Sequence, residues 1–263
     1  MNVNKGKITE EFYETETSSV PKRMLVYTPP HYCGERLPVL YLTHGIGQTE
    51  SSWIEKCGAD SVFDDAILCG EAEPFIAVMV NGRASEGGAI PGEKFGLMNI
   101  RVFMDFEYEL ISRIIPEVDS RYNTDARREG RAIAGFSMGG YQSVNFGLEH
   151  LDKFAYIGGF SPAPAVDPKS CAESFLAANR NADIKKLLRL FYLSNGALET
   201  GGEGIFGEFS KYSLRCLEYM DSIGIECVYE TFEGGHEAAV WKRSLESFVR
   251  LLWKQPQPQQ VLL

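Results

Sequence analysis

The sequence has few of the features that would assign it to a membrane or a nucleic acid. It contains no run of eighteen apolar residues, so we expect no membrane-spanning helix. Positive charge is scarce, because 26 lysines and arginines stand against 36 acidic residues, giving a net charge of −10 at pH 7. Proteins that bind nucleic acid gather lysine and arginine on one surface. We therefore expect neither a nucleic acid nor a membrane as partner, and instead a small molecule or a neutral polymer.

Targeting signals and cysteine motifs are also lacking. The first twenty residues contain no apolar segment of the kind found in secretory signals. The chain as given is therefore expected in the cytoplasm, or outside the cell if a signal was removed. Its six cysteines form no C-x-x-C motif and no metal-ligand spacing. We expect free, buried thiols, with one disulfide as the alternative.

The sequence does contain a regular alternation of strand-like and helical segments. This alternation over 263 residues predicts one α/β domain built on a mostly parallel, doubly wound sheet flanked by helices. Residues 7–13 and 22–27 predict an antiparallel hairpin at its N-terminal edge. Further strands are expected at 37–42, 74–80, 132–134, 154–160, 190–193 and 227–232, and helices at 60–69, 102–118, 183–188, 209–223 and 239–253. Residues 167–181 are interpreted as a cap or lid-like insertion, and residues 254–263 as a disordered tail.

The pentapeptide from Gly135 to Gly139 reads G-x-S-x-G, with Ser137 at its centre. An apolar run precedes it and a helical segment follows it, which is the order of strand, tight turn and helix that a nucleophile elbow requires. Glycine on both sides allows the close backbone approach of such a turn. Ser137 is therefore the predicted nucleophile, and it needs a base, an acid and an oxyanion hole.

Only four histidines can supply the base. His236 follows the last predicted strand and lies at the same sheet edge as Ser137. The order serine, acid, histidine is that of α/β-hydrolases, so His236 is the predicted base. His31 and His150 are interpreted as structural, and His44 as a brace for the glycine-rich corner after residues 37–42.

The acid is expected between Ser137 and His236, after a strand. Most carboxylates in this interval fall on predicted helices or on the last strand, which leaves the loop after residues 190–193. Glu199 is the predicted acid and Glu203 the alternative. The backbone N–H groups of Met138 and Ile46 are the predicted oxyanion donors, because one follows the nucleophile and the other lies in the first glycine-rich corner.

Four separated blocks carry a family resemblance. They are HGIGQ at 44–48 with Trp53, RAIAGFSMGG at 131–140, LDKFAYIG at 151–158, and GGH at 234–236 with VWK at 240–242. Together they resemble the feruloyl esterase domains attached to bacterial xylanases, in carbohydrate esterase family one, with its esterase D-like α/β-hydrolases and acetyl xylan esterases. The similar enzymes usually carry Asp after the glycine of the acid strand, whereas Gly196 here is followed by Ala197.

The resemblance implies an α/β-hydrolase catalytic domain over residues 1–253, no metal or organic cofactor, and hydrolysis of hydroxycinnamate esters on xylan. The expected substrate is then a small-molecule or oligosaccharide ester, and Trp53, Phe206 and Trp241 are candidate walls for an aromatic acyl group. The alternatives are an acetyl xylan esterase, another short-acyl or thioester hydrolase, or a catalytically silent carbohydrate-binding module.

Overall fold

The computed structural model describes residues 5–164, 168–179, 182–199 and 205–254, with the side chains of 168 and 205–207 also left out. Several predictions fall wholly or partly outside this set. They concern residues 255–263 of the expected tail, residues 167, 180 and 181 of the expected insertion, the alternative acid Glu203, and the side chain of Phe206.

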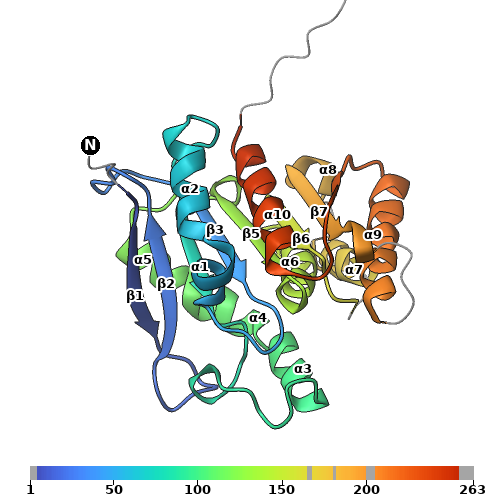
Figure 1. Ribbon diagram of the computed structural model, residues 1–263, viewed down its shortest axis with the longest axis horizontal. Coiled ribbons are helices and arrows are strands. Elements are labelled where there is room, and N and C mark those ends of the chain that lie inside the picture. Colours follow the sequence, from blue (N-terminus) through green and yellow to red (C-terminus); the bar gives the residue numbers. More distant parts are fainter. Residues whose placement is uncertain (1–4, 165–167, 180–181, 200–204, 255–263) are drawn as a thin grey trace, which may run out of the picture.

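Eight strands form one sheet in the order β1-β2-β4-β3-β5-β6-β7-β8 (Figure 1). The strands are β1 (Lys7–Tyr13), β2 (Lys22–Thr28), β3 (Val39–Thr43), β4 (Ile76–Val80), β5 (Arg131–Phe136), β6 (Tyr156–Phe160), β7 (Leu190–Gly196) and β8 (Val228–Phe232). From β4 to β8 all neighbours are parallel, while β2 is antiparallel to both β1 and β4. The predicted hairpin and the mostly parallel sheet are therefore confirmed.

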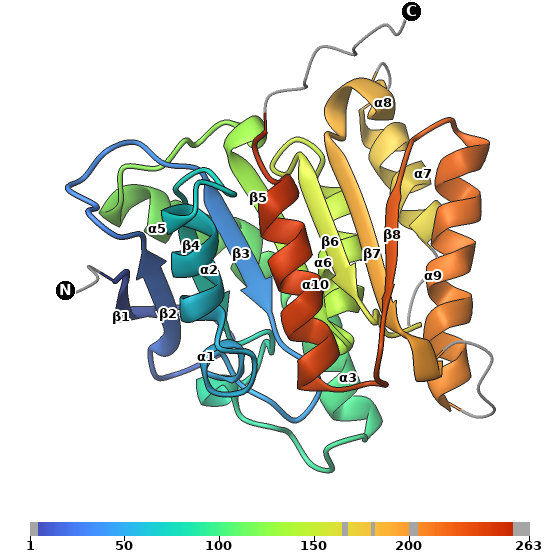
Figure 2. The same ribbon diagram turned by 45° about the horizontal axis from the view of Figure 1, so that its top comes forward.

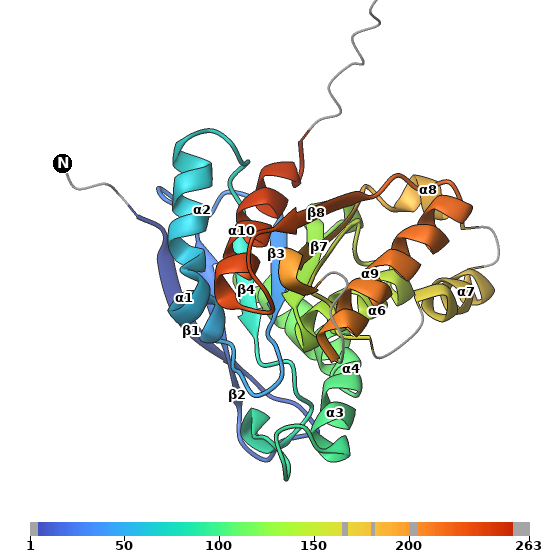
Figure 3. The ribbon, with the colours of Figure 1, turned by 45° about the vertical axis from the view of Figure 1, so that its right-hand side comes forward.

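Helices cover both faces of the sheet, as a doubly wound fold requires (Figures 2 and 3). The helices are α1 (Ser52–Cys57), α2 (Ala59–Leu68), α3 (Leu97–Met104), α4 (Glu107–Glu109), α5 (Ile115–Arg121), α6 (Met138–Glu149), α7 (Pro168–Ala178), α8 (Ile184–Leu187), α9 (Ile205–Ser222) and α10 (Ala238–Leu251). Short helical turns are η1 (Glu86–Gly88), η2 (Leu110–Ile114), η3 (Arg128–Gly130) and η4 (Ala197–Glu199). One apolar core lies under α1, α2 and α10, and the other under α5, α6, α7 and α9.

The central strands are apolar on both sides because each core needs one of their faces. All five residues of β3 and of β4 are buried, and so are all six of β5. Strands of this kind read as continuous apolar runs instead of alternating patterns. This is why the sequence located them well. Because these strands are parallel, their carboxyl ends lie together at one edge of the sheet.

Two expectations about the helices were wrong. Residues 102–118 do not form one helix: α3 ends at Met104, and the chain resumes as α4, the π-helical turn η2 and α5. Pro116 lies in the first turn of α5 and has no N–H to donate to the preceding turn, which a π-helical turn accommodates. Residues 168–178 form α7, whose Cys171 and Phe175 are buried in the core, so they are no lid.

None of the six cysteines, all of which the structure describes, forms a disulfide, and only three of them are buried. Cys33 and Cys69 are exposed, because they lie in surface turns. Within the described residues, no helix has the length and apolar character to cross a bilayer. No group of three or more potential ligands among the described residues is arranged to hold a metal ion.

Candidate active site

Ser137 lies at a sharp corner between β5 and α6. Its backbone has φ 56° and ψ −120°, a conformation that residues with a side chain rarely adopt. A methyl group added at Gly135 would lie 2.3 Å from the carbonyl oxygen of Gly139, so only glycine fits there. The Ser137 N–H donates to the carbonyl of Phe160 on the neighbouring strand, at 2.9 Å. The predicted elbow geometry is therefore present, and it presents the hydroxyl at the carboxyl edge of the sheet.

His236 lies in the loop between β8 and α10, close to this hydroxyl. Its Nε2 is 2.8 Å from Ser137 Oγ, although 99 residues separate the two in the sequence. The side chain is 15% exposed. Its ring packs against Phe209, with centroids 4.4 Å apart, and against the edge of Trp241 at 5.1 Å. These aromatic contacts fix the plane of the imidazole.

Glu199 lies at the end of η4, directly after β7. Its Oε1 is 2.5 Å from His236 Nδ1. A carboxylate only accepts hydrogen bonds, so Nδ1 carries the proton and the lone pair of Nε2 faces Ser137. The structure thus brings the three predicted residues into one continuous chain of hydrogen bonds.

The second oxygen of Glu199 has three donors that the sequence analysis missed. Oε2 accepts from Ser161 Oγ and from the Gly196 N–H, each at 2.7 Å, and from Asn195 Nδ2 at 3.2 Å. Burial alone would raise the pKa of Glu199, but the hydrogen bonds from His236, Ser161 and Gly196 outweigh it and lower the pKa. The carboxylate is therefore ionised although its side chain is fully buried.

A signal for Ser161 did exist in the sequence. It is the first residue after β6, and the ends of neighbouring parallel strands meet at the same edge. Its φ of 44° and its N–H bond to Ser194 turn the chain there toward the acid.

The two predicted oxyanion donors flank the nucleophile. Met138 begins α6, where helix N–H groups are unpaired and the helix dipole favours negative charge. Ile46 follows Gly45, and a methyl group added at Gly45 would lie 3.2 Å from Ser137 Cβ. Thr43 Oγ1 donates to the carbonyl of Gly139 at 2.8 Å, which ties the end of β3 to the first turn of α6. No described residue accepts a hydrogen bond from the N–H of Ile46 or Met138.

The remaining three histidines have surroundings different from those of His236. His150 Nε2 is 2.5 Å from Glu107 Oε1, and His31 is exposed in a turn with φ 65°. His44 is fully buried, and its Nε2 accepts the N–H of Gly82 at 3.2 Å. The prediction that it braces a loop is confirmed.

The predicted aromatic walls require correction. Trp53 is 0% exposed, because its ring packs edge-on against Phe136 and Phe160 and its Nε1 donates to Thr43. Trp241 is only 5% exposed, since it stacks on Phe136 with centroids 4.3 Å apart and faces the His236 ring. Both predictions were wrong, because these rings belong to the core that supports the site.

A different apolar surface borders the oxyanion donors. Met138, Phe103 and Tyr141 form a small buried cluster. Three partly buried side chains, Ile46, Ile100 and Ala163, pack against it. Ile100 comes from α3, and Ala163 is held by an N–H bond to the Ser137 carbonyl at 2.9 Å. We call Ile46, Ile100 and Ala163 the apolar rim.

The fold, with a serine at a strand–helix corner and a histidine after the last strand, is typical of the α/β-hydrolase class. The sequence matches the model of the Esterase family over residues 18–252. The chain therefore belongs to the Esterase family.

The similar curated proteins include a xylanase/feruloyl esterase and an S-formylglutathione hydrolase. An endo-1,4-β-xylanase/feruloyl esterase from Xylanibacter ruminicola is 31% identical over 237 residues, covering 83% of this chain and 31% of that protein. An S-formylglutathione hydrolase from Arabidopsis thaliana is 27% identical and covers 60% of this chain and 57% of that protein. The chain spans between 31% and 38% of the length of the first three curated relatives.

Solved structures show the same fold. A ferulic acid esterase from Anaeromyces mucronatus, in complex with ferulic acid, has a TM-score of 0.77 at 20% identity, covering 95% of this chain and 91% of that one. A feruloyl esterase module from Clostridium thermocellum, complexed with sinapinate, has a TM-score of 0.74 at 22% identity, covering 97% and 91%. At these identities the likeness establishes the α/β-hydrolase fold.

Proposed function

We propose that the chain is a serine esterase that releases hydroxycinnamates such as ferulate from plant cell-wall esters. The observation that carries the proposal is the hydrogen-bond chain from Ser137 through His236 to the buried, ionised Glu199. The 2.8 Å between Ser137 Oγ and His236 Nε2 suits proton transfer from the hydroxyl to the imidazole, and the 2.5 Å between His236 Nδ1 and Glu199 Oε1 suits a hydrogen bond that orients the ring.

In the acylation step, Ser137 Oγ attacks the ester carbonyl while His236 Nε2 takes its proton. The carbonyl oxygen becomes an oxyanion, which the N–H groups of Met138 and Ile46 stabilise. Collapse of this intermediate breaks the ester C–O bond, and His236 returns the proton to the departing sugar hydroxyl. Glu199 holds the imidazole in the required tautomer and stabilises its positive charge.

Deacylation repeats the same chemistry with water as the nucleophile. His236 removes a proton from the water as it attacks the acyl-serine, and then protonates Ser137 Oγ as the acid is released. Every proton that is transferred in this cycle passes through Nε2, so the protons taken up and released are balanced in both steps without a cofactor.

Two observations favour a hydroxycinnamoyl group. The relative from Xylanibacter ruminicola carries feruloyl esterase in its name, and two structures of the same fold were solved with ferulic acid or sinapinate. The apolar rim lies beside the proposed oxyanion donors, where an aromatic acyl group would lose contact with water. The N-terminal and C-terminal parts of the described chain contribute to one sheet, so we propose that it acts as one catalytic domain.

A substrate panel tests this proposal. We expect kcat/KM for methyl ferulate to exceed that for naphthyl acetate and for S-formylglutathione. A preference for the thioester would instead favour the activity named in the Arabidopsis thaliana relative. A preference for acetate would favour an acetyl esterase. A chain that hydrolyses none of the three and leaves a fluorophosphonate probe unreacted would be a silent binding module.

A further inference from the structure

His44 is a fully buried histidine next to the oxyanion donors that takes no part in the proposed proton transfer. It directly follows β3, and its two ring nitrogens have different partners. Nδ1 is 2.8 Å from the carbonyl oxygen of Gly45, and Nε2 is 3.2 Å from the backbone nitrogen of Gly82. A carbonyl only accepts and an N–H only donates, so Nδ1 carries the proton and Nε2 carries the lone pair. The surroundings thus specify one neutral tautomer.

The first of these bonds acts on the peptide group that contains a proposed oxyanion donor. The carbonyl of Gly45 and the N–H of Ile46 belong to the same planar, trans peptide, so they point in opposite directions. The Gly45 oxygen also accepts the N–H of Gln48, at 3.2 Å. Two donors therefore fix this oxygen, and the Ile46 N–H must point the other way. Gly45 is also the residue that lies against Ser137.

The imidazole itself is held rigidly. The carbonyl of Gly82 accepts from Gln142 Nε2, which also donates to the carbonyl of Phe103, both at 2.7 Å. The Phe103 ring packs on the imidazole at near right angles, with centroids 5.7 Å apart. Burial, together with the nearby charge of Arg83, lowers the pKa of His44 to about 3. The ring is therefore neutral throughout the pH range in which the imidazole of His236 can act as a base.

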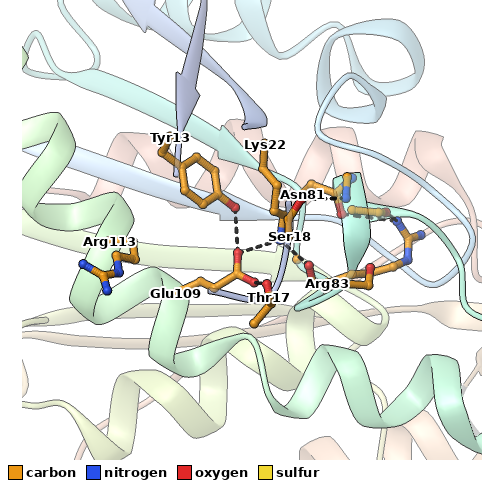
Figure 4. A network of polar contacts seen from close by, with 12 residues as sticks. Tyr13, Thr17, Ser18, Lys22, Asn81, Arg83, Glu109 and Arg113 are labelled. Carbon is orange, nitrogen blue, oxygen red and sulfur yellow. Dashed lines mark hydrogen bonds and ion pairs between the residues drawn. The ribbon is translucent and has the colours of Figure 1, made fainter. Parts of the chain in front are cut away.

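The far end of the loop is fixed by a separate buried group (Figure 4). The Arg83 guanidinium donates to the backbone carbonyl of Gln48 at 2.5 Å and to that of Gly88 at 3.2 Å. It also donates to the side-chain oxygen Oδ1 of Asn81 at 3.3 Å. The backbone carbonyl of Arg83 in turn accepts from Lys22. With Gln48 anchored in this way, its N–H and the Nδ1–H of His44 together oppose rotation of the peptide between Gly45 and Ile46.

We propose that His44 is a positioning residue for the oxyanion hole, which aims the Ile46 N–H by holding the Gly45 carbonyl. The inference rests on the proposed function, because it presumes that Ile46 binds an oxyanion. It gives the histidine of the HGIGQ segment a role distinct from that of the base.

Two polar variants separate this role from simple core filling. In His44→Asn the amide nitrogen occupies about the position of Nδ1 and can still donate to Gly45, whereas in His44→Gln the amide reaches the position of Nε2. Removing one oxyanion donor costs about 100- to 1,000-fold in kcat. We therefore expect His44→Gln and His44→Phe to lose roughly 10- to 100-fold in kcat with little change in KM, and His44→Asn to keep most activity.

A trifluoromethyl ketone, which forms an oxyanion on Ser137, provides the second readout. In each variant, its inhibition constant should rise by the same factor by which kcat falls. The melting temperatures of the variants should not rank in the order of these losses. Equal losses in His44→Asn and His44→Gln, or unchanged inhibition in His44→Phe, would overturn the inference. A wild-type chain that hydrolyses no ester would instead refute the proposed function. In that case a crystal structure of His44→Phe still decides, since the inference expects the peptide between Gly45 and Ile46 to rotate.

Discussion

Glu199 is the residue on which the electrostatics of the site depend. It is fully buried, yet four donors satisfy its two oxygens, one on Oε1 and three on Oε2. Burying a charge without partners is costly, and hydrogen bonds to the ionised form offset that cost. The extra methylene of glutamate, compared with the aspartate usual in similar enzymes, is accommodated because η4 brings residue 199 back toward His236.

We predict that Glu199→Gln lowers kcat/KM for a ferulate ester by on the order of 1,000- to 10,000-fold. The amide keeps the shape, but it no longer offers a negative charge to the imidazolium and it favours the wrong tautomer. Ser161→Ala is the matched variant, because it removes one of three donors to Oε2 and should cost only roughly 10-fold. Steady-state kinetics on both variants checks this, and near-normal activity of Glu199→Gln would show that another group orients His236.

The lowered pKa of Glu199 also predicts how stability depends on pH. A carboxyl group whose pKa is lower in the folded state than in the unfolded state, where it is about 4.3, stabilises the fold above that value. The contribution is lost as the pH falls through the folded-state pKa. Urea unfolding of the wild type and of Glu199→Gln between pH 3 and 7 measures it. The difference in free energy of unfolding should shrink toward low pH, and a constant difference would contradict the assignment.

At this scale the sequence predicted Ser137, His236 and Glu199 as a set that the structure brings together. The reason is that each follows a strand, and the ends of parallel strands meet at one edge. The position of Ser161 after β6 was a signal for its place at this edge, but its bond to Oε2, like that of Asn195, depends on side-chain directions that no motif encodes. Trp53 was misplaced because an aromatic residue near a strand end can face either the substrate or the core.

At the scale of elements, a buried ion pair ties the hairpin β1–β2 to helix α4 (Figure 4). Lys22 Nζ is 2.5 Å from Glu109 Oε2, and both side chains are almost completely buried. Tyr13 donates to the same oxygen at 2.9 Å, Thr17 donates to the other, and Lys22 also donates to the carbonyl of Arg83. The hairpin thereby supports the residue that anchors Gln48.

We predict that Lys22→Met destabilises the fold by about 3–5 kcal/mol, because it leaves a buried carboxylate without its cation. Chemical denaturation gives this free energy. The double variant Lys22→Met with Glu109→Leu should recover a large part of the loss, since it removes both charges. Additive losses in the double variant would show that the two side chains do not act as a pair.

The bounds of an element were predictable where a single strand-like segment ended directly at a turn. Strand β1 has the predicted bounds, and β2 extends one residue beyond them. The segment from α3 to α5 was not predictable, because its apolar spacing continues across the break at Asp105. Helical periodicity reports which face is apolar and does not report where the axis changes direction.

For the whole molecule, the account explains why residues almost 100 positions apart form one site. The connections through α6, α7 and α9 return β6, β7 and β8 to the same edge as β5, and two apolar cores hold the sheet between them. Strand order itself was outside the reach of the sequence, because many orders satisfy the same alternation of strands and helices. The family resemblance predicted the α/β-hydrolase fold, and local sequence patterns predicted most of its strands and helices.

Stoichiometric titration with a fluorophosphonate tests the central claim most directly, with the label located by peptide mass spectrometry and hydrolysis of methyl ferulate followed in the same samples. We expect activity to fall in proportion to the label on Ser137 and to reach zero at one label per chain. Full activity in a chain labelled at Ser137, or a label on another residue that accounts for the loss, would contradict the proposed mechanism.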